Sequence, residues 1–317
     1  MTWWGSQVRT LYRAPFFSGR ALLFGLQAKP VLWYQTKMPL SPQLNHLIKL
    51  LDDDSVVVRE AVQRELAGIH HELPGQIEHL ERPLTGEEER LVGELLESVR
   101  RTDLEETWMR WRWLGTPDEQ LEAALAHLSA FLNGWKTKPQ DLGERLDLVA
   151  QAAFHDQGRM DARELAEWLF GGRGGSARLR GNSKNYYAPE NSNLFWVLDN
   201  GMGNPISLSC IYRLVARRFG LTVEGCNFPG HFLARVTMNG KLWLVDCFNR
   251  GRFMLAADVA KHHPAANPAM EDLVREEAPI DAILLRILRN LDESYDRLHA
   301  MADRQLMRKL AMRVMDD

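Results

Sequence analysis

The dipeptide Asn239-Gly240 constrains the fold of this chain more than any other short stretch. It separates two runs rich in β-branched, aromatic and aliphatic residues, and Asn-Gly is the preferred pair for a two-residue type I′ hairpin turn. Such a turn fixes the register of the two strands, because Met238 must then pair with Lys241. The two predicted strands are residues 232–238 and 241–247.

This register brings a histidine and a carboxylate together. His231 falls opposite Phe248, and Asp246 is its diagonal neighbour on the same face of the sheet, within side-chain reach. Cys247 points to the opposite face, because side chains alternate along a strand. A carboxylate bonded to one imidazole nitrogen fixes the tautomer, and the other nitrogen can take a proton from a thiol or hydroxyl. His231 is therefore the candidate base, and Asp246 is the acid that orients it.

A helix upstream of the hairpin carries two candidate nucleophiles. Pro205 suits an early helical position, apolar residues then recur at helical spacing, and Gly220 ends the pattern. Ser207 lies in the first turn, where free N–H groups and the helix dipole favour a developing anion, and Cys210 lies one turn further in. By position alone, either residue could attack a substrate.

Each candidate also has a structural interpretation. A cysteine on the apolar stripe of a buried helix behaves as a small hydrophobe, and this applies to Cys210. Ser207 could cap the helix or bond its backbone, and His231 could simply be hydrogen-bonded at a strand start. A zinc site from Cys226, His231 and Asp246 is disfavoured, since no CxxC or HxxxH spacing is present. We expect no metal and no cofactor.

Four motifs in order carry a family resemblance. They are residues 186–192 (YYAPENS), 203–209 (GNPISLS), 227–233 (NFPGHFL) and 246–251 (DCFNRG). The chain resembles the SirB-type branch of the transglutaminase-like family over about residues 121–289. The resemblance implies a papain-like α+β core, with a nucleophile on a helix and a His-Asp pair on strands. In the wider family the helix residue is cysteine, whereas the equivalent positions 205–207 of this chain contain none.

Composition bounds the class of protein. A chain of 317 residues with 45% hydrophobic residues can bury a substantial core and form two domains. The net charge of −3 gives no general electrostatic reason to expect nucleic acid or a membrane as partner. Three irregularly spaced cysteines argue for a reducing compartment, and no apolar run reaches the ~20 residues of a membrane span. We expect a cytoplasmic protein.

The pattern along the chain predicts four regions. Residues 1–37 contain no acidic residue and are expected to be a disordered extension, with Met38 as an alternative start. Residues 38–115 are helical and include a pair, 44–51 and 56–69, that resembles one HEAT-like unit. The α+β core, a helix plus an antiparallel sheet, covers residues 116–278. Residues 279–317 form C-terminal helices.

Two segments allow a nucleic-acid interpretation. Trp108, Trp111 and Trp113 alternate with arginines, but at helical spacing the first two more simply share a packing face. The glycine-rich segment 171–184 carries four basic residues and no acid. It could steer an acidic substrate as a lid or touch RNA, but we expect a mobile surface loop.

Two functions follow from these observations. The first is an acyl-transfer enzyme, a hydrolase or transferase acting on an amide or ester, with Cys210 or Ser207 attacking and His231 and Asp246 assisting. The second is a catalytically inactive descendant of the same fold that binds a protein or peptide partner.

Overall fold

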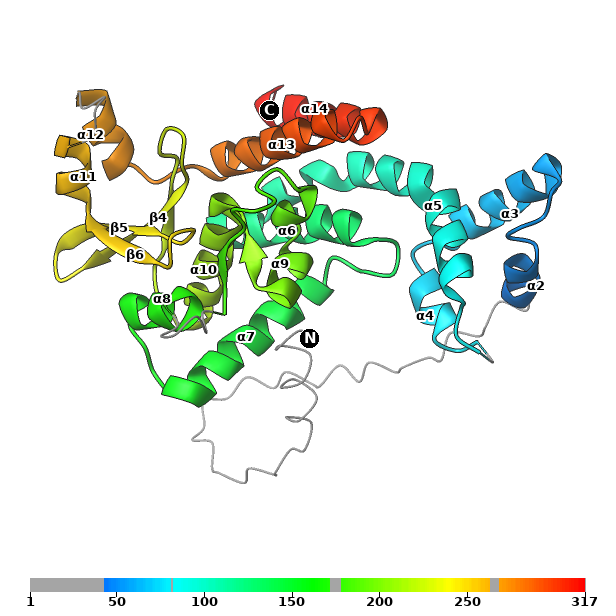
Figure 1. Ribbon diagram of the computed structural model, residues 1–317, viewed down its shortest axis with the longest axis horizontal. Coiled ribbons are helices and arrows are strands. Elements are labelled where there is room, and N and C mark those ends of the chain that lie inside the picture. The colour runs from blue at the N-terminus through cyan, green and yellow to red at the C-terminus, as the bar shows by residue number, and fades with distance from the viewer. Residues whose placement is uncertain (1–42, 81, 172–177, 263–267, 317) are drawn as a thin grey trace. The chain divides into compact units, whose positions relative to one another are not determined.

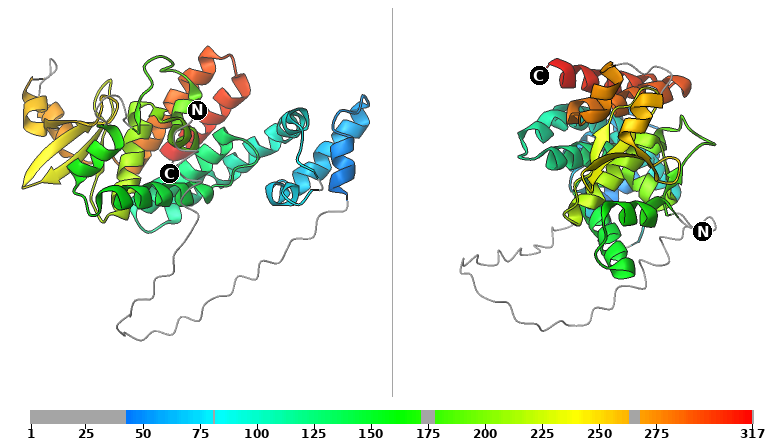
Figure 2. Two further views of the ribbon diagram at one scale, coloured as in Figure 1. Left: turned by 60° about the horizontal axis from the view of Figure 1, so that its bottom comes forward. Right: turned by 90° about the vertical axis from the view of Figure 1, so that its left-hand side faces the viewer.

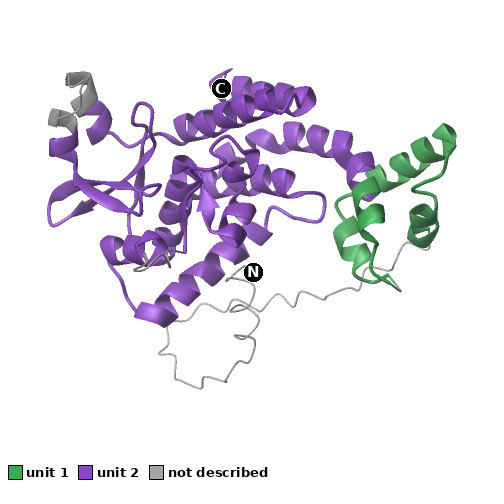
Figure 3. Cartoon of the chain, in the orientation of Figure 1, with its two compact units in different colours: residues 1–91 green, residues 92–317 purple. Residues whose placement is uncertain are grey.

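The computed structural model describes residues 43–80, 82–171, 178–262 and 268–316. The chain divides into two compact units, residues 1–91 and 92–317 (Figure 3). The predicted extension and residues 172–177 of the glycine-rich segment lie outside the described part. Among the described helices, none has both the length and the apolar character that crossing a bilayer requires.

The described part of the first unit is helical, as the apolar periodicity predicts. Its helices are α2 (Leu44–Lys49), α3 (Val56–Gly68), α4 (Leu73–Ile77) and the start of α5 (Gly86–Thr107). The buried side chains of α2 and α3 recur at helical spacing: Leu44, Ile48, Val62 and Leu66. α2 and α3 therefore form a contacting pair.

The second unit is helical from its start to Phe170. After α5 follow η1 (Trp108–Trp113), α6 (Pro117–Asn133), α7 (Asp141–Gln157) and α8 (Ala162–Phe170). α6 begins at the predicted capping box, in which Thr116 and Glu119 bond each other's backbone N–H. Trp108 and Trp111 are buried, which confirms the packing interpretation, whereas Trp113 is 88% exposed.

A four-stranded antiparallel sheet follows in the order β3-β4-β5-β6. Its strands are β3 (Glu224–Cys226), β4 (Leu233–Met238), β5 (Lys241–Asp246) and β6 (Arg252–Leu255). Met238 pairs with Lys241, which confirms the predicted register. Asn239 and Gly240 both have positive φ angles, 51° and 69°, as a type I′ turn requires.

The sheet is covered on both faces (Figures 1 and 2). α10 (Pro205–Arg218) contacts β3 and β4 on one face. On the other face, α11 (Ala256–His262) and α12 (Pro268–Arg275) close a cluster of buried side chains. That cluster contains Cys226, Phe228, Leu233, Leu244, Ala256 and Val274. Residues that alternate along β4 and β5 therefore enter two different cores.

The remaining elements of the second unit precede α10 in the sequence or follow α12. They are β1 (Arg180–Gly181), η3 (Pro189–Ser192), α9 (Leu194–Asn200), β2 (Met202–Gly203), α13 (Ile280–Arg297) and α14 (Met301–Asp316). β1 pairs with β2 in parallel. α13 buries the predicted stripe, which includes Ile283, Ile287 and Leu291. It packs beside α14, as Figures 1 and 2 show.

Candidate functional site

A tight turn places His231 just before the start of β4. Pro229 and Gly230 occupy its two central positions, Gly230 has φ +71°, and the His231 N–H donates to the Phe228 carbonyl at 3.1 Å. These are the features of a type II turn, which favours proline first and glycine second. The sequence Phe-Pro-Gly-His thus fixes the direction in which the imidazole leaves the backbone.

His231 and Asp246 form the predicted pair. His231 Nε2 lies 2.9 Å from Asp246 Oδ1. Asn249 also binds the carboxylate, its backbone N–H to Oδ1 at 3.1 Å and its side-chain amide to Oδ2 at 2.8 Å. Burial alone would raise the pKa of Asp246, but the hydrogen bonds from His231 and Asn249 outweigh it and hold this pKa below its ordinary value.

The ionised carboxylate sets the tautomer of the imidazole. Because Asp246 can only accept, Nε2 of His231 must donate, and Nδ1 of the neutral ring is left as an acceptor. Within the described part of the chain, Nδ1 has no hydrogen-bond partner. The pair can therefore take a proton at Nδ1 and stabilise the resulting imidazolium.

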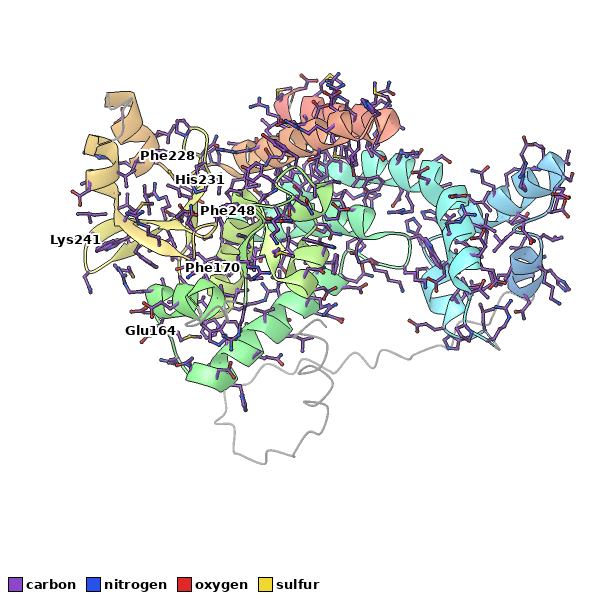
Figure 4. All side chains as sticks on the ribbon, viewed as in Figure 1. Glu164, Phe170, Phe228, His231, Lys241 and Phe248 are labelled. Carbon is purple, nitrogen blue, oxygen red and sulfur yellow. The ribbon has the colours of Figure 1, made fainter. Side chains whose placement is uncertain are left out.

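The His231–Asp246 pair is partly accessible to solvent. The side chain of His231 is 27% exposed and that of Asp246 is 11% exposed. In Figure 4, His231 lies between Phe228 and Phe248. Phe248 meets the imidazole edge to face at 6.3 Å and meets Tyr186 in the same way at 5.9 Å. Phe248 thus lies between the imidazole and Tyr186.

Ser207 lies in a capping box at the start of α10. Its Oγ accepts from the Asn204 N–H at 3.2 Å and donates to the Asn204 carbonyl at 3.1 Å. The Asn204 side chain in turn accepts from the Ser207 N–H at 2.9 Å. Ser207 is buried, and its hydroxyl is engaged by the backbone at the first turn of the helix.

Cys210 and Cys247 are buried on the face of the sheet that α10 covers. Burial raises the pKa of Cys210 from 9.0 to about 12 and raises the pKa of Cys247 further still. The position of Cys247 agrees with the prediction that it faces away from His231. Cys226 lies in the other core, where burial raises its pKa to about 11.

The structure thus joins two of the four predicted site residues. His231 and Asp246 are hydrogen-bonded, whereas no hydrogen bond connects either of them to Ser207 or Cys210 in the described residues. A nucleophilic role for Ser207 or Cys210 stays a prediction.

Asn249 is a site residue to which the sequence analysis assigned no role. It lies three residues after Asp246, in the turn that follows β5, and binds both carboxylate oxygens. An asparagine just after a strand that ends in aspartate is a usable signal, because asparagine side chains commonly bond nearby groups in turns.

Comparison with known proteins places this geometry in a family context. Residues 136–289 match the profile of the Transglutaminase-like superfamily. The chain is 33% identical over 218 residues to a UPF0162 protein of Xylella fastidiosa strain 9a5c, which covers 62% of this chain and 75% of that protein. A UPF0162 protein of strain Temecula1 is equally similar, with 33% identity over 219 residues.

A shorter similarity reaches eukaryotic proteins. Over 72 residues the chain is 38% identical to F-box only protein 21 of Mus musculus, a match that covers 23% of this chain and 12% of that protein. No solved structure matches the chain.

Proposed function

The chain belongs to the UPF0162 family and contains a transglutaminase-like domain, and from this premise we propose that it is a catalytically inactive, protein-binding member of that superfamily. One observation carries the proposal: neither candidate nucleophile is available to His231. The Ser207 hydroxyl is engaged in the capping box, and the Cys210 thiol is buried. A base without a nucleophile cannot perform acyl transfer through a covalent intermediate.

The properties of Cys210 argue in the same direction. Burial raises its pKa from 9.0 to about 12, so near neutral pH the thiol holds its proton more firmly than an exposed cysteine does. Catalytic cysteines show the opposite shift, since the thiolate is the attacking species. Cys210 therefore has the properties of a core residue.

A match within a longer protein agrees with use as a binding module. A segment similar to 72 residues of this chain makes up 12% of F-box only protein 21. Such a segment is a small part of its host protein, which is typical of a module joined to others. The partner class that we propose for this chain is a protein or peptide.

The alternative is an acyl-transfer enzyme, and the His231–Asp246 contact favours it. In that mechanism, Nδ1 of His231 would take the proton of a thiol or hydroxyl as it attacked an amide or ester carbonyl, and the same proton would pass to the leaving group. The mechanism requires a rearrangement that exposes Cys210 or frees the Ser207 hydroxyl.

Three finer assignments are further proposals. The four sequence motifs support the SirB-type branch of the superfamily. The contacting pair α2 and α3 supports a HEAT-like N-terminal unit. The cysteine content supports a cytoplasmic location.

Chemical labelling separates the two functions. Native chain is treated with iodoacetamide across pH, and separately with a fluorophosphonate, and adducts are located by mass spectrometry. We expect Cys210 to stay unlabelled until the chain is unfolded in urea, which is the positive control, and Ser207 to stay unmodified. Rapid labelling of Cys210 near neutral pH that His231→Ala abolishes, or a fluorophosphonate adduct on Ser207, would instead establish an activated nucleophile.

A further inference from the structure

Two exposed tyrosines lie beside the His231–Asp246 pair. Tyr186 is 42% exposed and Tyr187 is 45% exposed. Their rings meet edge to face at 5.2 Å, and Tyr186 meets Phe248 at 5.9 Å. Because Phe248 also contacts the imidazole, aromatic rings run without a break from the surface to His231. Exposed tyrosines in such an arrangement are typical of binding surfaces.

A buried asparagine network holds the backbone of these tyrosines. The Asn191 amide donates to the Asn185 carbonyl at 2.7 Å and to the Tyr186 carbonyl at 2.9 Å. The Asn182 amide donates to Asn191 Oδ1 at 2.9 Å. Asn182 and Asn191 are themselves buried. The tyrosines are therefore presented on a fixed backbone, which lowers the entropy lost when a ligand binds.

Among the described residues, Arg286 has no acidic partner, and it lies near Tyr186 and the turn that carries His231. Arg286, from α13, donates to the Phe228 carbonyl at 2.9 Å and to Asn227 Oδ1 at 2.5 Å. The Phe228 carbonyl also accepts the backbone N–H of His231, so the Arg286 guanidinium binds the turn that carries the imidazole. In the described ranges, no carboxylate lies within ion-pair distance of Arg286.

The electrostatics of Arg286 differ from those of its neighbour Arg297. Arg297 stacks on Tyr187 at 3.6 Å and is neutralised by Glu293 at 2.8 Å. Within the described part of the chain, Arg286 donates only to the neutral acceptors Asn227 and Phe228, and burial lowers its pKa, an effect that the nearby Tyr186 opposes. A half-buried guanidinium with free donors is a strong site for a carboxylate, because hydrogen bonds between charged groups are stronger than neutral ones.

We propose that Tyr186, Tyr187, His231 and Arg286, here called the tyrosine–arginine face, bind an acidic peptide segment of a partner protein. A side-chain carboxylate of the peptide contacts Arg286, and the acceptor Nδ1 of His231 takes an N–H of the peptide. A neighbouring aromatic or aliphatic side chain packs on Tyr186 and Tyr187. The inference rests on the proposed binding function and specifies the chemistry of its ligand.

The charge distribution favours a peptide over a nucleic acid. A polyanion needs several free cations along its length. On the tyrosine–arginine face, no described carboxylate pairs with Arg286, whereas Arg297 forms an ion pair with Glu293. The chain as a whole carries a net charge of −3. A single carboxylate beside an apolar residue fits this surface better than a phosphate backbone.

Peptide selection on the full chain tests the proposal. A phage library of short random peptides is selected on immobilised protein, and enriched peptides are synthesised and titrated by fluorescence anisotropy. We expect enriched sequences to carry Asp or Glu next to an aromatic or aliphatic residue. Removing one contact with Tyr186→Ser or Arg286→Gln should weaken binding about tenfold or more.

Matched variants guard against misfolding. Lys241→Gln removes the same charge at the exposed tip of the hairpin and should leave the affinity unchanged. Arg286→Gln also removes a bond to the turn that carries His231, so its circular dichroism must match that of the wild type. Tyr186→Ser changes an exposed side chain, so its effect on peptide affinity does not depend on the turn that carries His231.

The other outcomes overturn the inference. These are enrichment of peptides without a carboxylate, unchanged affinity in both Tyr186→Ser and Arg286→Gln, no enrichment at all, or oligo(dT) bound at this face in preference to the peptides. Unchanged affinity in the variants would refute binding at the tyrosine–arginine face and would place the peptide site elsewhere on the chain. Labelling of an activated Cys210 would refute the proposed inactive, protein-binding function without testing the tyrosine–arginine face.

Discussion

Replacing Ser207 with alanine tests whether its hydroxyl serves the fold. The substitution removes Oγ, which accepts from the Asn204 N–H at 3.2 Å and donates to the Asn204 carbonyl at 3.1 Å in a buried setting. Leaving a buried N–H unpaired costs about 1–3 kcal/mol. The better helix propensity of alanine offsets this loss by about 0.5 kcal/mol. We therefore expect Ser207→Ala to lower the free energy of unfolding by about 2 kcal/mol.

Ser209 offers a matched control on the same helix. It is also buried, but its Oγ donates to the Pro205 carbonyl at 2.9 Å and otherwise meets the weakly bonding thiol of Cys247. This is a back-bond of a kind that contributes little to helix stability. Ser209→Ala should therefore cost less than about 1 kcal/mol.

Differential scanning calorimetry measures both variants. For a domain of 150–250 residues, 2 kcal/mol corresponds to a fall in Tm of about 4–8 °C, and the fall should appear in the transition of residues 92–317. The capping argument is refuted if Ser207→Ala shifts Tm by less than about 1 °C, or if Ser209→Ala is equally destabilising. The first result would mean that the Ser207 hydroxyl contributes little to the fold, and the second that its capping bonds contribute no more than the bond of Ser209.

Two further perturbations test the geometry around the site. The folded-state pKa of Asp246 is depressed, so the stability that its carboxylate contributes is complete above the unfolded pKa of about 3.9 and is lost as pH falls through the folded value. The Tm difference between wild type and Asp246→Asn should therefore be full at neutral pH and shrink below about pH 4. A difference independent of pH would contradict the hydrogen-bonded carboxylate. Gly201 has φ +68°, and a Cβ there would lie 2.6 Å from the Arg178 carbonyl oxygen, so Gly201→Ala should lower the free energy of unfolding in urea by about 3 kcal/mol. Gly220 has φ +70° with open space around it, so Gly220→Ala should lower it by only about 1 kcal/mol. Equal costs would show that the close approach to Arg178 is unimportant.

Local turn chemistry explains why the hairpin and the His-Asp pair were predictable. Asn239-Gly240 determines the turn type, the turn type determines the register, and alternation along the strands then places Asp246 and Cys247 on opposite faces. Each step involves residues close together in the sequence. The separation between His231 and Asp246 is itself short, because the hairpin folds one strand back on the other.

The environments of Ser207 and Cys210 were less predictable from the sequence. Helical periodicity places both residues on α10, but it does not say which hydroxyl bonds the backbone or how deeply a thiol is covered. The burial of Cys210 depends on packing between α10 and the sheet, which contains residues far along the chain. The sequence therefore left the nucleophilic and the structural interpretations open.

Arg286 escaped prediction for a related reason. It lies on α13, separated from the Phe228 carbonyl by 58 positions in sequence. Its neighbours on α13 form a clear amphipathic stripe, so the periodicity of the helix assigns Arg286 only to its polar side. That it meets the turn carrying His231 follows from how α13 docks, and docking is a tertiary property.

The alternation of side chains on β5 makes the His231–Asp246 pair and the core beneath α10 interdependent. Asp246 and Cys247 are adjacent, yet the Asp246 carboxylate binds His231, whereas the Cys247 thiol is buried among the side chains of α10. Inserting or deleting one residue in the β4–β5 turn would exchange their faces. A thiol would then lie beside the imidazole and a carboxylate would enter an apolar interior. The length of the two-residue turn thus determines whether a carboxylate or a thiol lies beside His231. A change in that length would also require compensating substitutions in the hydrophobic core.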